Sequence, residues 1–220
     1  KQNFKYSEFG PVLELKDKAF ALRHATQNSF QEIDGWFALN EAQSVQAFES
    51  ALSSRKIPSF NFVVMDASQN IGFFYNGRIP TRENPKAARK VVQGISSSAI
   101  WPLNRPIEKL PTFINPPNGW IQSTNQNPYA VMGKHSMALD PKNPNVYFEQ
   151  RLTNRSFVAN ELLSTPIKIT LDDFIDIKFD HSYSENSRQF KYLMKLAENN
   201  SDIAEKVRPW DRQTNFKNKH

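Results

Sequence analysis

Two nearly continuous apolar runs separated by a polar turn are the strongest constraint on the fold of this chain. The segment SFNFVVMDASQNIGFFYNG covers residues 59–77, and its apolar runs, 60–65 and 71–75, flank the polar residues 66–70. Aromatic and β-branched residues on both sides of a polar turn predict an antiparallel β-hairpin. Because both strands are apolar at nearly every residue, we expect their sheet to be covered on both faces.

Other segments of the first two thirds carry local signals of their own. Residues 10–25, GPVLELKDKAFALRHA, place apolar residues on both sides of a Lys-Asp-Lys turn and predict a second hairpin. Residues 39–54, LNEAQSVQAFESALSS, repeat apolar residues at helical spacing, with Ser44 able to cap a second helical piece. Prolines spread through residues 78–118 predict a long loop, after which residues 120–124 predict one more short strand.

The last third of the chain is predicted to be helical. Residues 154–165, 170–180 and 184–200 each space their apolar side chains for one buried stripe. Thr170 can cap the second of these helices, and the two aspartates in its first turn suit the positive end of the helix dipole.

The balance of strand and helix signals indicates the fold class. We expect an α+β protein with antiparallel strands first and helices in the last third. A portion of central sheet would occupy residues 1–150, and a helical segment residues 151–220. Apolar residues make up 39% of the chain and charged residues 23%, so a core is feasible, and 17 phenylalanines indicate that aromatic rings fill much of it.

Composition also excludes several kinds of site. The chain has no cysteine, so it has no disulfide, no thiol nucleophile and no cysteine-ligated metal. Its four histidines fall in no metal-ligand spacing, no serine-triad motif occurs, and no window is apolar for long enough to span a membrane. The residues alone therefore predict no metal, no other cofactor and no membrane partner.

The net charge of +6, with an isoelectric point near 9.4, raises the question of nucleic-acid binding. Five basic residues cluster around a single glutamate in the proline-rich segment: Arg78, Arg82, Lys86, Arg89 and Lys90. No phosphate-binding glycine loop, zinc finger or aromatic RNA-binding motif accompanies them. A solvated basic loop and a nucleic-acid site are the two interpretations. We predict the first, so nucleic acid is not an expected partner.

Two further groups of polar residues have both a catalytic and an ordinary interpretation. Asp173, Asp176 and Asp180 recur at helical spacing, so they form either a metal or acid–base site or a solvated helix face. His24, at the end of a predicted strand, acts as a base or packs at the strand edge. We favour the ordinary interpretation for both groups.

Amide side chains are concentrated in INPPNGWIQSTNQNPY, residues 114–129. Asn125 follows the predicted strand 120–124, and a strand end can hold a side chain rigidly within reach of a pocket. The NH2 group of an asparagine is a neutral donor that can stabilise an oxyanion without forming an ion pair. Asparagine before Gln-Asn-Pro is also ordinary turn chemistry. The residues alone leave both interpretations open.

A series of short stretches follow one another from near the first residue to nearly the last: FGPVLE, FALRHAT, WFALNEAQSVQAFESAL, IPSFNFVVMDASQNIGFFYNGRIPTR, LPTFINPPNGWIQSTNQNPY, NRSFVANELLS, ITLDDF and RPWDRQ. In this order and at these spacings they resemble the penicillin acylase family of N-terminal-nucleophile hydrolases, which includes penicillin acylases and acyl-homoserine-lactone acylases. Each stretch is weak by itself, whereas the run from NFVVMDASQNIGFFYNGRIP to INPPNGWIQSTN is specific.

The resemblance implies a four-layer αββα sandwich and hydrolysis of a linear amide to a carboxylic acid and an amine. The precursor of a family member cuts itself to expose an N-terminal serine, which attacks the amide carbonyl with its own α-amino group as base. An asparagine side chain and a backbone N–H form the family's oxyanion hole, and this asparagine falls on Asn125. The family's second asparagine is Gln126 here, a departure, and the arginine that supports the site falls on Arg155.

The resemblance also implies that both flanks of the family domain are missing. We expect the nucleophilic serine and the backbone donor upstream of Lys1, and further helices downstream. The chain would then be an internal part of a β-subunit and inactive alone, with the α-subunit and the remainder of the β-subunit as partners and a small N-acyl molecule as substrate. The family's calcium site would lack its upstream ligands, and both Ser136 and Asp140 lie near the downstream position, so no cofactor is predicted.

Three points stay open in this interpretation. The acyl group and the amine would be those of a β-lactam antibiotic or of an acyl-homoserine lactone used in quorum sensing, because the pocket residues lie mostly upstream. The family's usual export implies a periplasmic or secreted protein. A non-catalytic binding or interaction module on the same fold is the alternative from another class.

Overall fold

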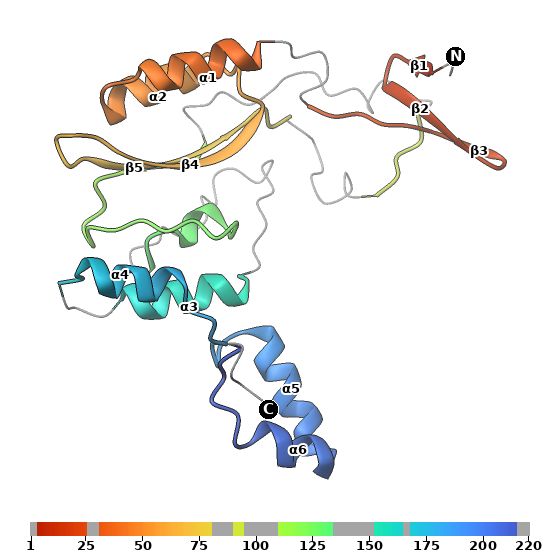
Figure 1. The fold of residues 1–220 in the computed structure, drawn as a ribbon. Helices are drawn as coiled ribbons and strands as arrows, with labels where there is room; N and C mark the ends of the chain where they lie inside the picture. Colours follow the sequence, from red (N-terminus) through yellow and green to blue (C-terminus); the bar gives the residue numbers. More distant parts are fainter. Residues whose placement is uncertain are drawn as a thin grey trace. The chain divides into compact units, whose positions relative to one another are not determined.

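The structure is a computed structural model, and it describes residues 4–25, 31–80, 90–94, 110–133, 152–164 and 168–214. These residues fall into two compact units, one ending at Ile114 and the other beginning at Asn115 (Figure 1). The predicted boundary near residue 150 lies outside the described residues and stays a prediction.

A small antiparallel sheet begins the first unit. It consists of β1 (Lys5–Ser7), β2 (Gly10–Leu15) and β3 (Lys18–Ala21), in the order β1-β2-β3. The hairpin predicted within residues 10–25 is therefore confirmed. Its turn is tight because Lys16 adopts a left-handed backbone conformation, with φ of 53°.

The second sheet contains the hairpin that constrains the fold most strongly. Its strands are β4 (Ser59–Met65), β5 (Ile71–Gly77) and β6 (Thr112–Ile114), all antiparallel in the order β4-β5-β6. The predicted hairpin is confirmed. The prediction that residues 78–118 form only loop is wrong at β6, which pairs with β5, a strand far from it in sequence.

Two helices cover one face of the β4–β5 hairpin (Figure 1). They are α1 (Glu32–Glu41) and α2 (Val45–Ser53). Ser44 caps α2, because its hydroxyl accepts a hydrogen bond from the backbone N–H of Ala47 at 3.1 Å. The sequence-based prediction of two helical pieces divided at Ser44 is confirmed.

The core of this unit lies between these helices and the hairpin. Its buried members are apolar residues from both layers: Leu39, Val45, Leu52, Ile57 and Phe74. The rings of Phe48 and Phe62 meet edge to face beside them, with centroids 5.3 Å apart. Gly72 allows the close approach of α2, because a Cβ at Gly72 would lie 2.9 Å from Cγ1 of Val45. The predicted aromatic core is confirmed here.

Burial of the sheet on both faces is confirmed for β5 only. Phe73 and Phe74 point to opposite faces of β5, and they are 0% and 3% exposed. In β4, by contrast, Val63 is 48% exposed and Met65 is 68% exposed. An apolar run thus marks a strand but does not show whether a partner covers each face.

The second unit is helical after residue 152. Its helices are α3 (Asn154–Leu163), α4 (Leu171–Lys178), α5 (Arg188–Glu198) and α6 (Ser201–Val207). The first three are the helices predicted from the sequence, and the predicted cap at Thr170 is present as a full capping box with Asp173. Helix α6 was not predicted.

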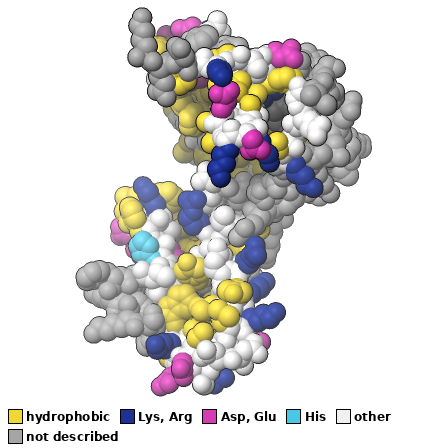
Figure 2. Space-filling view, turned by 90° about the vertical axis from the view of Figure 1, so that its right-hand side faces the viewer, with side chains coloured by type: hydrophobic (Ala, Val, Ile, Leu, Met, Phe, Trp, Pro, Cys, Tyr) yellow, Lys and Arg dark blue, Asp and Glu magenta, His cyan; other side chains and the backbone are white. Residues whose placement is uncertain are grey.

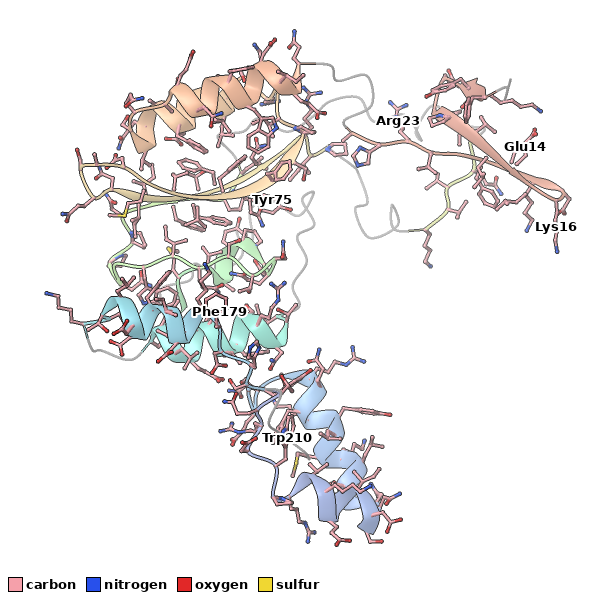
Figure 3. All side chains as sticks on the ribbon, in the orientation of Figure 1. Glu14, Lys16, Arg23, Tyr75, Phe179 and Trp210 are labelled. Atoms are coloured by element: carbon pink, nitrogen blue, oxygen red, sulfur yellow. The ribbon has the colours of Figure 1, made fainter. Side chains whose placement is uncertain are left out.

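Aromatic rings pack against one another near the C-terminal end of the described chain. Trp210 lies beside α5 (Figure 3), with its ring centroid 6.4 Å from that of Phe190 and 5.6 Å from that of Tyr183. Its indole N–H donates to the carbonyl oxygen of Gln213 at 2.8 Å. None of the described helices is both long enough and apolar enough to cross a membrane.

Candidate active site

The segment that carries Asn125 is an extended loop and not a strand. Residues 120–124 form no ladder in the described structure, so the predicted strand is wrong. The backbone N–H of Gln122 donates to the carbonyl oxygen of Val131 at 3.0 Å, and the loop then turns back through a 3-10 helix at Pro128–Ala130. A β-strand needs a neighbouring strand with which to form a ladder of backbone hydrogen bonds. Here hydrogen bonds from side-chain amides hold this segment instead.

Gln122 fastens this loop to helix α3. Its Nε2 donates to the carbonyl oxygen of Ala130 at 3.2 Å and to Oδ1 of Asn160 at 3.0 Å. Gln122 is 7% exposed, and buried amide hydrogen bonds of this kind give a loop a defined position against a helix. Sequence reasoning missed Gln122 and Asn160, because no local pattern connects residues so far apart along the chain.

Helix α3 presents Arg155 to the same loop. The helix begins after Thr153, whose hydroxyl caps the backbone N–H of Ser156, so Arg155 lies in its first turn. One terminal guanidinium nitrogen donates to the carbonyl oxygen of Thr124 at 3.1 Å and to Oδ1 of Asn125 at 3.2 Å. The structure therefore brings together the two residues that the resemblance singled out.

The Arg155 contact determines which way the Asn125 amide faces. A guanidinium can only donate, so the amide atom facing it must be the oxygen. The NH2 group then points away from Arg155, and Nδ2 makes no hydrogen bond to any residue in the described part of the chain. Asn125 is exposed, so a reacting molecule could reach this donor.

The backbone of Asn125 is in the left-handed region, with φ of 61°. This conformation costs most residues about 1–2 kcal/mol, and asparagine tolerates it better because its side chain hydrogen-bonds locally. A left-handed residue persists when its surroundings hold it in place. At this site, the bond from Arg155 to the carbonyl oxygen of Thr124 is one such restraint.

The charge of Arg155 adds to the electrostatics of the amide. No described carboxylate forms an ion pair with Arg155. Its positive charge therefore stays close to Asn125 Oδ1 and polarises the amide, which strengthens the NH2 group as a donor. The pair can hold a developing negative charge next to Nδ2.

The aspartates weighed as an alternative site are a helix cap, a turn residue and an exposed residue. Asp173 belongs to the capping box, and hydrogen bonds from the Thr170 hydroxyl and backbone N–H hold the pKa of its carboxyl below the ordinary value of 3.8. Asp180 lies beyond the end of α4 and accepts from the backbone N–H and the hydroxyl of Ser182. Asp176 is exposed.

No metal site can be assembled from the part of the chain that the structure describes. That part contains no group of three or more His, Asp or Glu side chains placed to hold a metal ion. Ser136 and Asp140, the two residues near the family's downstream calcium position, lie outside the described residues. No chemistry through calcium is therefore derived for this chain.

The basic cluster is described only in part. Arg82, Lys86 and Arg89 lie outside the described residues. Arg78 has a structural role, since its guanidinium donates twice to the carbonyl oxygen of Arg55, at 2.8 and 2.6 Å. On the face drawn in Figure 2, lysine and arginine side chains are spread among acidic and uncharged ones. The prediction that nucleic acid is not a partner stays a prediction.

A solved structure shares this architecture. It is a thermostable penicillin G acylase from Alcaligenes faecalis in an orthorhombic crystal form, and the match has a TM-score of 0.71 over 96% of this chain at 20% identity. The chain spans 38% of the length of that solved chain. The fold class is therefore the mixed α/β, antiparallel-sheet architecture of a penicillin acylase.

The sequence then assigns the family. The family model described as penicillin amidase matches residues 1–219, and the chain belongs to the penicillin amidase family. This confirms the resemblance drawn from the ordered stretches.

Proposed function

We propose that this chain carries the oxyanion-stabilising part of an N-acyl amide hydrolase, which cleaves a linear amide to a carboxylic acid and an amine. The observation that carries the proposal is the hydrogen bond from Arg155 to Asn125 Oδ1 at 3.2 Å. It orients the asparagine so that its NH2 group is a donor directed away from the arginine. Family membership among amidohydrolases supports the same function.

The role of Asn125 follows from the charge that develops during amide hydrolysis. A serine hydroxyl attacks the amide carbonyl carbon, and the carbonyl oxygen takes up the electron pair as an oxyanion. Asn125 Nδ2 donates a hydrogen bond to this oxygen, which is strongest when the charge is fully developed. The C–N bond then breaks, the amine leaves with a proton from the general base, and water hydrolyses the acyl-enzyme ester.

Arg155 acts in this scheme through Asn125. It keeps the amide from rotating and keeps its oxygen away from the oxyanion. Its positive charge adds a favourable potential at the site without an ion pair to the substrate. Arg155 is therefore a positioning residue, and Asn125 is the residue that contacts the reacting atoms.

The nucleophile is proposed to lie outside these 220 residues. The mechanism needs a serine whose own α-amino group is free to act as base. The chain spans 38% of the length of the similar solved penicillin G acylase chain, so such a serine can lie in further polypeptide. We propose that further polypeptide supplies the serine, the backbone half of the oxyanion hole and an apolar acyl pocket, within a four-layer αββα sandwich exported to the periplasm or the medium.

An assay of amine release tests the proposed function. The isolated 220-residue chain and the complete protein that carries it would be compared on a panel of chromogenic N-acyl anilides. We expect turnover by the complete protein and none above buffer by the isolated chain, because only the former holds a nucleophile. Comparing turnover of phenylacetyl anilides with turnover of anilides that carry longer acyl chains then distinguishes β-lactam-type from homoserine-lactone-type acyl specificity.

Two results would contradict this account. Turnover by the isolated chain that survives further purification, and that Asn125→Ala abolishes, would place the nucleophile within these residues. A complete protein without turnover on any anilide, but with saturable binding of an N-acyl compound, would favour the non-catalytic binding module instead.

A further inference from the structure

Gln126 is buried directly beside the exposed Asn125. It is 5% exposed, and both the oxygen and the nitrogen of its side-chain amide form hydrogen bonds. Oε1 accepts from the backbone N–H of Thr124 at 2.6 Å and from the Thr124 hydroxyl at 2.9 Å. Nε2 donates to the carbonyl oxygen of Gln122 at 3.2 Å. The Gln126 amide thus links residues 122, 124 and 126 by hydrogen bonds and fixes the backbone conformation of this part of the loop.

Thr124 is held from two sides by residues that come from different elements. Gln126 accepts from its N–H and hydroxyl, and Arg155 on α3 donates to its carbonyl oxygen at 3.1 Å. That carbonyl belongs to the peptide bond leading into Asn125, whose φ is 61°. Rotation of this peptide would break the bond from Arg155, and the bonds to Gln126 hold the N–H and the side chain of Thr124 on the other side of its Cα. The left-handed conformation of Asn125 is therefore maintained by Gln126 as well as by Arg155.

We propose that Gln126 is a positioning residue for the Asn125 donor. This inference rests on the proposed function of Asn125, because a positioned donor matters only if it meets an oxyanion. When Gln126 loses its hydrogen bonds, the peptide of Thr124 can rotate and Nδ2 of Asn125 moves away from its catalytic position. The loss affects kcat more than KM, since the oxyanion exists in the transition state and not in the bound substrate.

The first variant is Gln126→Met in the complete protein, assayed on a chromogenic N-acyl anilide. Methionine has a similar length and removes both the acceptor and the donor. We expect kcat to fall roughly tenfold to a hundredfold, because small misplacements of catalytic groups have effects of that size. KM should stay within about twofold of wild type.

The second variant, Gln126→Glu, separates positioning from simple loss of stability. An ionised carboxylate keeps the acceptor for Thr124 but opposes the carbonyl oxygen of Gln122, whereas a protonated carboxyl donates to that oxygen as the amide does. Burial raises the pKa of the introduced carboxyl. The ratio of the variant's kcat to the wild-type kcat should therefore rise as the pH is lowered, within one protein preparation.

Two comparison variants make the outcomes distinguishable. Asn127→Ala removes the cap of the 3-10 helix at Pro128–Ala130 and leaves the bonds of Gln126 in place, so it should lower the melting temperature without changing kcat more than about twofold. Asn125→Ala reports whether the donor matters at all.

The proposal is supported if Gln126→Met lowers kcat at constant KM and Gln126→Glu recovers at low pH. It is overturned if Asn125→Ala is severely impaired while Gln126→Met keeps a wild-type kcat, whatever its melting temperature. If Asn125→Ala itself keeps a wild-type kcat, the proposed function fails, and the positioning role fails with it.

Discussion

At the scale of single residues, the reach of the Arg155 side chain matters more for its contacts than the two terminal nitrogens of its guanidinium group. Both of its hydrogen bonds, to Thr124 and to Asn125, come from the same terminal nitrogen. That nitrogen is one bond further from the backbone than the ammonium nitrogen of a lysine would be. This contact therefore requires a long side chain with two donor directions fixed in one plane, and it does not use two different guanidinium nitrogens.

Arg155→Lys should therefore impair turnover although it keeps the positive charge. The shorter side chain cannot reach both acceptors without moving α3 or the loop, so Nδ2 of Asn125 loses its direction. We expect kcat of the complete protein to fall about tenfold or more. Arg188→Lys is the matched control, because Arg188 on α5 is exposed and its side chain makes no hydrogen bond among the described residues. Activity of Arg155→Lys within twofold of that control would show that charge alone suffices.

The residues of the site could be predicted only in part from the sequence. Asn125 and Arg155 were found through the order of the family's stretches, and the contact between them is then a property of the folded chain. Gln122 and Asn160 were not found, because their hydrogen bond joins residues 38 positions apart. Local patterns carry no signal for a pair of amides that meets only after folding.

At the scale of secondary-structure elements, Asp66 joins the β4–β5 turn to helix α2. Its Oδ1 accepts from the backbone N–H groups of Ser68 and Asn70, both at 2.9 Å, and its Oδ2 accepts from the N–H of Val45 at 3.2 Å. The Asn70 side chain, which donates to the Asp66 carboxylate, is the main reason that the pKa of Asp66 is lowered.

Removal of this carboxylate should destabilise the protein in a pH-dependent way. Because the pKa of Asp66 in the folded state lies below its ordinary value of 3.8, its stabilising effect is present above that value and is lost as the pH falls through the folded pKa. Asp66→Ala should therefore lower the melting temperature at about pH 7, and the gap to wild type should close in acid. Ser68→Ala, which keeps the backbone donor, should show no gap. A difference in melting temperature between Asp66→Ala and wild type that stays constant with pH would contradict the claim that the ionised carboxylate is what stabilises the fold.

Elements with local signals were predicted well, and elements that depend on a distant partner were not. The β4–β5 hairpin, the cap at Ser44 and the capping box at Thr170 all follow from residues a few positions apart. Strand β6 exists because β5 lies beside it, whereas residues 120–124 form no strand because none of the described residues pairs with them in a ladder. Apolar alternation predicts that a segment can pair but not whether it does.

At the scale of the whole molecule, the chain is a penicillin amidase family member that spans 38% of a similar solved penicillin G acylase chain. The chain divides into two compact units, and both Asn125 and Arg155 belong to the second. The donor of the proposed oxyanion hole can therefore be organised by one unit, while the proposed nucleophile and acyl pocket come from further polypeptide.

The central claim is that Asn125 donates to the oxyanion of amide hydrolysis, and kcat of the complete protein tests it most directly. Asn125→Ala should reduce kcat by roughly 10²–10³ with folding intact, as for loss of one oxyanion donor. Asn125→Asp keeps the acceptor for Arg155 but removes the NH2 group, and it should lose as much. Asn127→Ala should stay within about twofold of wild type, because the Asn127 side chain caps the 3-10 helix at Pro128–Ala130. Equally small losses at residues 125 and 127 would contradict the account.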